Sequence, residues 1–166
     1  ITAMIPVFLT SSILVSPKFL ILVGCLAGFL IYNWSPAKIF MGDVGSTFLG
    51  AIYFGIIINF ESTNDAFSFF LIGLPLLGDA FICIVRRFFY RQNIFTPHKL
   101  HLYQRLNQAG ISHKNVSLIY ASLTFITCLY IFVFKVAYLH VYIFLLILVY
   151  IYMDKFLAIP LKKRRK

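Results

Sequence analysis

The stretch NVSLIYASLTFITCLYIFVFKVAY, residues 115–138, decides the fold of this chain. Lys135, near its end, is the one charged residue in this stretch. A helix needs about 20 apolar residues to cross a hydrocarbon layer about 30 Å thick, and this stretch meets that requirement. Residues 115–138 therefore predict a helix that spans a membrane.

The composition of the whole chain agrees with a membrane location. Of its 166 residues, 61% are hydrophobic and 12% are charged, whereas soluble domains carry about a quarter charged residues. The formal net charge of +10 does not indicate a nucleic-acid partner, because the Lys and Arg residues lie between apolar stretches and not along one basic face. The three cysteines lie inside apolar runs without metal-ligand spacing, so we expect them in the core; they are Cys25, Cys83 and Cys128.

A scan for similar stretches gives six expected transmembrane segments. They are residues 1–15, 18–34, 47–60, 66–90, 115–138 and 139–160, and the first is incomplete. We therefore expect an all-α fold, a polytopic transmembrane helix bundle that forms one integral-membrane domain over residues 1–166. Because the chain begins inside an apolar stretch, we expect it to be the C-terminal part of a longer protein. In the short third segment, Gly50 and Gly55 predict close contact between helices.

The Lys and Arg residues fall mainly on one side of these segments. Only Lys18 and Lys135 lie on the other side. Because short cytoplasmic loops carry an excess of Lys and Arg, we expect the loops 33–46 and 86–114 and the C-terminus in the cytoplasm, with residues 61–65 opposite. The basic tail, residues 162–166, is expected to attract anionic membrane lipid as well.

The loop NWSPAKIFMGDVGS, residues 33–46, has the features of a turn that leads into a helix. Pro36 ends the incoming helix, while Gly42 and Gly45 allow backbone conformations and a close approach that a side chain would block. Ser46 is expected to cap a helix that begins at Thr47. A turn with a capping serine is the simpler interpretation of this loop.

Asp43 supports a second interpretation of the same loop, a divalent-metal site. The start of a helix offers free N–H groups and the positive end of a dipole to an anion, and a carboxylate beside it supplies a hard oxygen ligand. Mg²⁺ usually takes one or two carboxylates together with phosphate oxygens and waters. Asp43 is thus a candidate ligand for Mg²⁺, or for Mn²⁺ in its place, next to a bound phosphate.

The second cytoplasmic loop predicts a short surface helix over residues 97–109, with Thr96 as N-cap and Gly110 as the stop. Helical spacing places four polar side chains on one narrow arc, where we expect them to bind an anion; they are His98, His101, Arg105 and Gln108. The alternative is an amphipathic helix whose polar face is merely solvated.

Asp79 lies inside the segment 66–90, where a charged side chain is costly unless it is paired or hydrated. Arg86 follows about two turns later on nearly the same helix face, so we expect both to face a polar cavity that leads to the active site and to bind substrate there. The alternative for Asp79 is a hydrogen-bonded contact between helices.

The stretch 33–46 resembles the signature N-x-x-P-A-x-x-F-M-G-D-x-G-S of the polyprenyl-phosphate N-acetylhexosamine-1-phosphate transferases, or glycosyltransferase family 4. The resemblance implies that Asp43 is a catalytic Mg²⁺ ligand and that the other matching residues bind substrate; they are Asn33, Gly42, Gly45 and Ser46. Family members also carry a His-rich loop that often ends H-x-H-H. His101 fits its first histidine, so the resemblance implies that His101 is a catalytic residue that contacts a phosphate or the sugar. Tyr103 and Gln104 depart from the motif, as in a branch that acts on modified N-acetylhexosamines.

The resemblance implies a Mg²⁺-dependent phosphotransferase of the EC 2.7.8 type in the bacterial cytoplasmic membrane. Undecaprenyl phosphate would attack a UDP-N-acetylhexosamine and release UMP, as the initiating step of O-antigen or cell-envelope polysaccharide synthesis. The upstream D-D-x-x-D motif of the family does not occur in this sequence, so we do not expect the chain to turn over alone. The alternatives are a phospho-MurNAc-pentapeptide transferase of peptidoglycan synthesis and a non-enzymatic transporter or lipid-binding subunit; whether the protein forms a homodimer is open.

Overall fold

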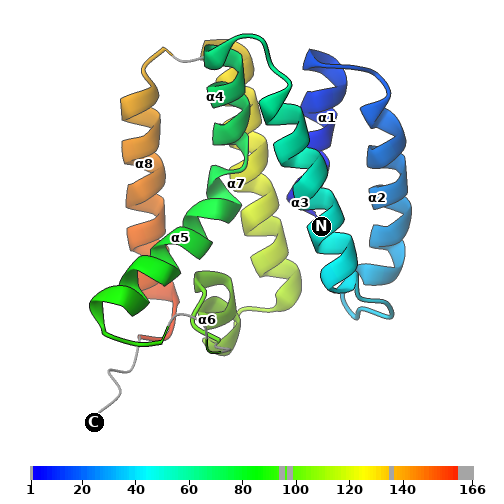
Figure 1. The fold of residues 1–166 in the computed structure, drawn as a ribbon. Helices are drawn as coiled ribbons and strands as arrows, with labels where there is room; N and C mark the ends of the chain where they lie inside the picture. Colours follow the sequence, from blue (N-terminus) through cyan, green and yellow to red (C-terminus); the bar gives the residue numbers. More distant parts are fainter. Residues whose placement is uncertain (1, 94–95, 97–98, 135–136, 161–166) are drawn as a thin grey trace.

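The computed structural model of this chain describes residues 2–93, 96, 99–134 and 137–160, and within these ranges it contains helices and no strand (Figure 1). In chain order the helices are α1 (Met4–Leu14), α2 (Phe19–Asn33), α3 (Gly42–Ile58), α4 (Thr63–Ile72), α5 (Leu74–Phe89), α6 (Leu102–Gln108), α7 (His113–Phe134) and α8 (Leu139–Tyr152). A π-helical turn, Met153–Leu157, follows α8. The predicted all-α fold is confirmed.

The longer helices run between two ends of a bundle (Figure 1). One end, which we name the site end, holds the loop between α2 and α3, the C-terminal end of α5, helix α6 and the π-helical turn. The connections from α1 to α2 and from α3 to α4, and the start of α8, lie at the opposite end. The two loops that the sequence places on one side of the membrane therefore share one end of the structure. Lys135 and the basic tail, residues 162–166, lie outside the described residues.

The apolar helices lie where the spans were predicted, but several are shorter and one predicted span is bent. Within the described ranges, two helical stretches are long and apolar enough to cross a membrane, His113–Phe134 and Leu139–Leu157, while α1, α2 and α3 are apolar but shorter. The stretch 66–90, predicted as one span, is instead two helices, α4 and α5, whose axes differ by 74°. The two helices together are long and apolar enough for one span, so the structure changes the shape of this predicted segment from a straight helix to a bent pair.

The bend lies at Gly73, between the end of α4 and the start of α5. Pro75, the second residue of α5, lacks a backbone N–H, so it fits the start of a new helix and cannot continue α4. The Tyr53 hydroxyl of α3 accepts a hydrogen bond from the Gly73 N–H at 3.0 Å. The same hydroxyl lies 3.0 Å and 2.9 Å from the carbonyl oxygens of Phe69 and Phe70. Because lipid cannot satisfy free backbone groups, these contacts stabilise the bend.

Two clusters of buried side chains hold the bundle together. The first cluster contains side chains of the helices α1, α2, α3, α4 and α7, and Phe8 and Phe69 are almost completely buried in it. The second packs α6 against α7 and α8 through Leu102 and Leu106. The apolar side of α6 therefore packs against the bundle, and this packing holds the second loop at the site end.

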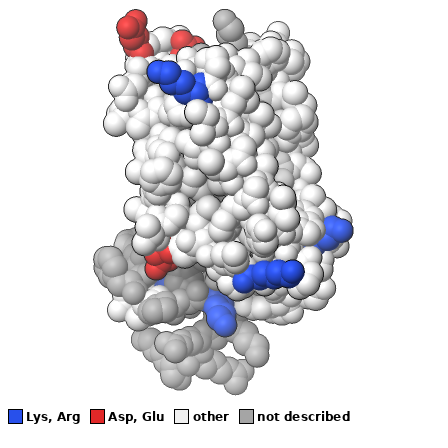
Figure 2. All heavy atoms as spheres, turned by 90° about the vertical axis from the view of Figure 1, so that its right-hand side faces the viewer, with Lys and Arg blue, Asp and Glu red and all other residues white. Residues whose placement is uncertain are grey.

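The outer surface of the bundle is mainly apolar. On the face that Figure 2 shows, charged side chains gather near the two ends, and a broad uncharged band separates them. Ile21 of α2, Ile58 of α3 and Phe132 of α7 are 72%, 82% and 62% exposed. Such extensive exposure of large apolar side chains fits lipid as the solvent, and the chain is a multi-pass membrane protein.

Two predictions about small residues were wrong. A Cβ atom added at Gly50 or Gly55 meets nothing within 4 Å, so these glycines do not mark close contacts between the described helices. Cys25, expected in the core, is exposed on α2, whereas Cys83 and Cys128 are buried as predicted. Cys25 therefore belongs to the outer apolar surface.

Candidate active site at one end of the bundle

The loop between α2 and α3 is closed by its own hydrogen bonds. The Asn33 side-chain amide donates to the Ile39 carbonyl at 2.7 Å. The backbone N–H groups of Lys38 and Ile39 donate to the Tyr32 carbonyl at 2.8 Å and 3.3 Å. Gly42, the first residue of α3, has a φ of +68°, in the left-handed region that glycine adopts without strain. Asn33 and Gly42 thus shape the loop.

Helix α3 begins before its predicted start at Thr47. Ser46 is therefore not the N-cap, and its hydroxyl donates a hydrogen bond of 3.0 Å to the Asp43 carbonyl inside the first turn. A Cβ atom at Gly45 would collide with the Met41 side chain, so this glycine lets the end of the loop pack against the helix. The glycines and the serine of the motif thus fix the turn that carries Asp43.

The Asp43 side chain is exposed in the first turn of α3, at the site end. Among the residues that the structure describes, no three His, Cys, Asp or Glu side chains come together to hold a metal ion. Asp43 offers one carboxylate, which fits Mg²⁺ bound mainly by phosphate oxygens and water. The described part of the chain therefore supplies one candidate ligand for Mg²⁺ or Mn²⁺, and not a complete protein cage.

Asp79 of α5 is buried and contacts the start of α6. Its carboxylate accepts hydrogen bonds from the N–H groups of Leu102 at 2.8 Å and Tyr103 at 3.3 Å. The Tyr120 hydroxyl of α7 donates to the same carboxylate at 2.8 Å. Asp79 thus makes the contact between helices that the sequence left as its alternative role.

Helix α6 is shorter than predicted. It begins at Leu102 and not at residue 97, and His101 is its N-cap, with an extended ψ of 148°. The Gln104 side chain accepts a hydrogen bond from the His101 N–H at 3.3 Å. His98 lies outside the described residues. The predicted arc of polar side chains is therefore wrong for His101, because this residue precedes the helix.

The His101 ring faces a small cavity together with Tyr103. The two rings stack with 5.6 Å between their centroids and 21° between their planes, and Tyr103 meets Tyr120 edge to face at 6.5 Å. Both rings line a cavity of about 340 Å³, and Asp79 and Ser117 line it as well. Partial burial, and next the Asp79 carboxylate, raise the pKa of the Tyr103 phenol above its usual value.

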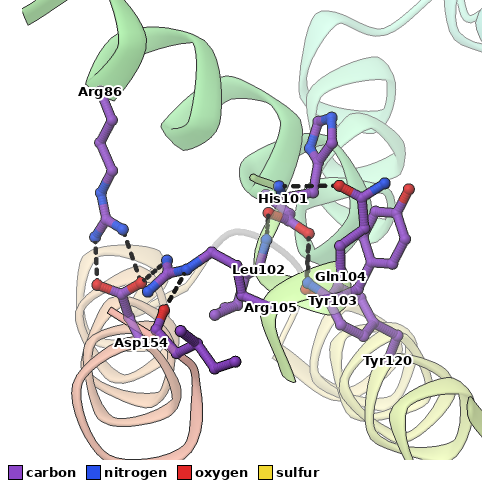
Figure 3. A network of polar contacts seen from close by, with 10 residues as sticks. Arg86, His101, Leu102, Tyr103, Gln104, Arg105, Tyr120 and Asp154 are labelled. Carbon is purple, nitrogen blue, oxygen red and sulfur yellow. Dashed lines mark hydrogen bonds and ion pairs between the residues drawn. The ribbon is translucent and has the colours of Figure 1, made fainter. Parts of the chain in front are cut away.

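Arg86 pairs with Asp154 of the π-helical turn and not with Asp79 (Figure 3). Its Nη1 and Nη2 atoms each donate to one oxygen of the Asp154 carboxylate at 2.7 Å. Arg105 donates to the same carboxylate, and its Nε donates to the Ile159 carbonyl at 2.8 Å. One carboxylate therefore holds two guanidinium groups from α5 and α6, and a positive charge remains in excess.

A larger cavity, of about 410 Å³, lies between α5, α6 and α8. Asp79 and Arg86 both line it, as their shared helix face predicts, but most of the lining is apolar and includes Ile82, Ile147 and Ile151. The prediction of a polar cavity was therefore wrong in its chemistry. Because Arg86 lies near the C-terminal end of α5, the positive charge lies at the site end of this apolar cavity.

Asp154 is the residue that the sequence analysis missed. A usable signal was present, because Asp154 is an acidic residue inside the predicted segment 139–160, where an unpaired charge is costly. Its partners Arg86 and Arg105 lie 68 and 49 residues away in the sequence, so local spacing could not identify them.

The two loops meet at the site end. The Nζ atom of Lys114, in the first turn of α7, lies 6.0 Å from the centroid of the Trp34 ring in the first loop, within the range of a cation–π contact. The predicted site residues nevertheless form two groups on different elements, and within the second group His101 and Arg105 line different cavities. The first group, around the start of α3, is Asn33, Gly42, Asp43, Gly45 and Ser46; the second, around α6, is Asp79, Arg86, His101 and Arg105.

Known proteins similar to this chain are polyprenyl-linked sugar phosphotransferases. The profile described as glycosyl transferase family 4 matches residues 1–61. A probable undecaprenyl-phosphate N-acetylglucosaminyl 1-phosphate transferase of Bacillus subtilis is 35% identical over 130 residues, which is 75% of this chain and 36% of that protein. A decaprenyl-phosphate N-acetylglucosaminephosphotransferase of Mycobacterium leprae is 37% identical over 115 residues, 60% of this chain and 29% of that protein.

A third relative carries a different name. The phospho-N-acetylmuramoyl-pentapeptide-transferase of Carboxydothermus hydrogenoformans is 34% identical over 113 residues, 66% of this chain and 33% of that protein. The chain thus spans about a third of the length of the curated relatives it matches. No solved structure matches it.

Proposed function

This chain belongs to the family of polyprenyl-phosphate N-acetylhexosamine-1-phosphate transferases, and on that premise we propose that the full-length protein transfers N-acetylhexosamine 1-phosphate from a UDP-sugar to undecaprenyl phosphate. A phosphate oxygen of the lipid attacks the β-phosphorus of the UDP-sugar. The bond from that phosphorus to the bridging oxygen breaks, and UMP leaves with the bond's electrons. The product is a polyprenyl-diphospho-N-acetylhexosamine, the first lipid intermediate of O-antigen or another cell-envelope polysaccharide.

The observation that carries this proposal is the position of Asp43. Its carboxylate is exposed in the first turn of α3, at the same end of the bundle as His101 and the Arg86 guanidinium. Phosphoryl transfer needs alignment and neutralisation of charge more than it needs covalent catalysis. An exposed acid at a glycine-containing helix start, next to cationic loops, supports that kind of chemistry.

The roles of the individual residues follow from their places. Asp43 is proposed to hold Mg²⁺, or Mn²⁺ in its place, and the bound ion would neutralise charge on the transferred phosphate and the UMP leaving group. Asn33, Gly42, Gly45 and Ser46 shape the loop that presents Asp43. His101 is proposed to contact a phosphate or the sugar from its cavity. His98, outside the described residues, is proposed as a second donor from the same loop.

The larger cavity is proposed to take the polyprenyl phosphate. Its lining is mainly apolar and lies along helices of the membrane region, which suits an isoprenoid chain. Arg86 and Arg105 share Asp154, so the site end of the cavity keeps a net positive charge that attracts a phosphate monoester. An amphiphile with a phosphate head therefore fits this cavity better than a nucleotide does.

We propose that the site end faces the cytoplasm of a bacterial cell, at the inner membrane. The basic residues of the loops 33–46 and 86–114 support this orientation, since Lys and Arg are retained on the cytoplasmic side. A cytoplasmic site end gives the protein access to a UDP-sugar in water and to a lipid phosphate in the adjoining leaflet.

The second candidate function is phospho-MurNAc-pentapeptide transfer, which the name of the Carboxydothermus hydrogenoformans relative favours. Tyr103 and Gln104 stand where the histidine-rich loop of the family often has its last two histidines, a departure that resembles a branch acting on modified N-acetylhexosamines. UMP release from UDP-N-acetylglucosamine and from UDP-MurNAc-pentapeptide, measured side by side with the full-length protein, decides between the two donors.

Asp43→Asn in the full-length protein tests the proposed metal site. The change removes one negative charge at nearly constant volume, so we expect UMP release at saturating Mg²⁺ to fall about a hundredfold or more. Asp65→Asn, an exposed acid at the opposite end of the bundle, is the control and should keep wild-type activity. Equal elution of both variants on size exclusion in detergent shows that they fold. Activity of Asp43→Asn within about threefold of wild type would remove Asp43 from the metal site.

A further inference from the structure

Helix α6 cannot hold its own position. It has 7 residues, and isolated helices shorter than about 12–15 residues are marginal in water. Leu102 and Leu106 bury its apolar side against α7 and α8. Burial of apolar surface is not directional, so these contacts set the depth of α6 but not the orientation of its first turn. Directional contacts must therefore come from polar groups.

Asp79 supplies these directional contacts from α5. Its side chain is 5% exposed, and its two oxygens accept from the Leu102 and Tyr103 N–H groups, one oxygen for each. With His101 as N-cap, Leu102 and Tyr103 are the first two residues of α6. Their N–H groups have no acceptor within the helix, and the second of them is one that an N-cap side chain often serves. Because each oxygen of the Asp79 side chain accepts one of these hydrogen bonds, Asp79 acts as a cap supplied by a neighbouring helix.

Tyr120 of α7 reinforces the same arrangement in two ways. Its hydroxyl donates to Asp79 at 2.8 Å, which orients the carboxylate. Its ring meets the Tyr103 ring edge to face, and Tyr103 stacks on His101. Helix α5 is thus linked to His101 through the backbone of the first turn of α6, and helix α7 is linked to it through the rings of Tyr120 and Tyr103. His101 itself lines the cavity of about 340 Å³.

We infer that Asp79 and Tyr120 are positioning residues for His101. They act through the first turn of α6 and its ring stack, and not by contact with the substrate that the sequence predicts for Asp79. This inference rests on the proposed function, in which His101 contacts the substrate. In this role, the buried Asp79 side chain determines the geometry of the second loop.

The test uses the full-length protein with Asp79→Asn, Tyr120→Phe and His101→Ala, alone and in pairs. We expect kcat for UMP release to fall about ten- to hundredfold for Asp79→Asn and about three- to tenfold for Tyr120→Phe, with smaller changes in KM. Because both residues act through His101, either change should lower kcat by less than about twofold in the His101→Ala background. Thr124→Val is the control, since Thr124 is buried on α7 and its hydroxyl donates to the carbonyl of Tyr120, within its own helix.

Amide hydrogen exchange of residues 99–108 provides a readout that does not need activity. Exchange should become about tenfold faster or more in Asp79→Asn and should be unchanged in Thr124→Val. Unchanged exchange in Asp79→Asn, or an equal loss of kcat with and without His101, would overturn the inference. If Asp79→Asn does not fold, Tyr120→Phe decides by the same two criteria. A full-length protein that releases no UMP from any UDP-sugar would reject the proposed function, while exchange would still decide whether Asp79 fixes α6.

Discussion

Gly42 and Gly50 serve different purposes in the same helix. Gly42 has a φ of +68° at the start of α3, where a side chain is strained, whereas Gly50 lies in the helix interior, where an added Cβ atom meets nothing within 4 Å. The first glycine therefore determines how the turn that carries Asp43 is formed. The second has no conformational requirement, so the two positions offer a matched pair of substitutions.

Gly42→Ala is expected to destabilise the first turn of α3 by about 1–2 kcal/mol, because a left-handed φ is unfavourable for alanine. Since Asp43 follows directly, UMP release by the full-length protein should also fall. Gly50→Ala should leave activity unchanged and stabilise α3 by up to about 1 kcal/mol, since alanine is the better helix former. Thermal unfolding in detergent and UMP release measure both effects. Equal behaviour of the two variants would show that the backbone at Gly42 does not present Asp43.

At this scale the sequence identified single residues better than their partners. Asp79 could be found from a general cost, since a charged residue inside an apolar segment needs a reason. Asp43 became a candidate because its carboxylate stands between glycines at a helix start, where an anion can bind beside a cation. The direction in which the Arg105 side chain points could not be predicted, because it depends on where α6 begins and on Asp154, which lies 49 residues later in the sequence. Helical spacing applied from residue 97 placed His101 and Arg105 on one face, and the observed start at Leu102 separates them.

At the scale of elements, the bend between α4 and α5 determines what α5 can reach. The axes differ by 74°, so α5 crosses the site end obliquely and brings Asp79 to α6 and Arg86 to Asp154. Gly73 and Pro75 mark the bend in the sequence, but hydropathy alone joins the residues on both sides into one apolar run. The hydroxyl of Tyr53 could not be anticipated, because its contacts depend on the packing of α3 against α4.

Tyr53→Phe tests what holds the bend. Without the hydroxyl, the Gly73 N–H and the carbonyls at the end of α4 lose a partner in a region without water, so we expect a loss of about 1–3 kcal/mol in stability. Tyr152→Phe is the matched control, because Tyr152 is 56% exposed on α8. Thermal unfolding of the full-length protein in detergent compares the two. An unchanged melting temperature for Tyr53→Phe would mean that Gly73 and Pro75 alone maintain the bend.

At the scale of the whole molecule, the arrangement of charge was the most predictable property. Every apolar run must be helical in lipid to satisfy its backbone, so counting the runs and the basic residues between them predicts the bundle and its shared end. The structure confirms that the loop 33–46 and the described parts of the loop 86–114 share one end. Whether the site end faces the cytoplasm or the opposite side of the membrane is a separate prediction.

Thiol labelling of spheroplasts tests the orientation. In a full-length background without native cysteines, Asp65→Cys should react with a membrane-impermeant maleimide on intact spheroplasts. Lys114→Cys should react only after permeabilisation, because the basic loops remain on the cytoplasmic side. Both positions are exposed in the structure, so access from water is not limited by packing. The reverse pattern would place the site end outside the cell and exclude a cytoplasmic donor.

The ion pairs of Asp154 impose an order on biosynthesis. The ribosome makes Arg86 and Arg105 68 and 49 residues before it makes Asp154. During translation, both guanidinium groups must form hydrogen bonds to water or to lipid head groups, since an unpaired arginine is costly in hydrocarbon. The nascent chain thus acquires the final arrangement of its arginines only after α8 has been inserted. A premature stop within α8 would leave residues 1–138 intact and still deprive both arginines of their counter-charge.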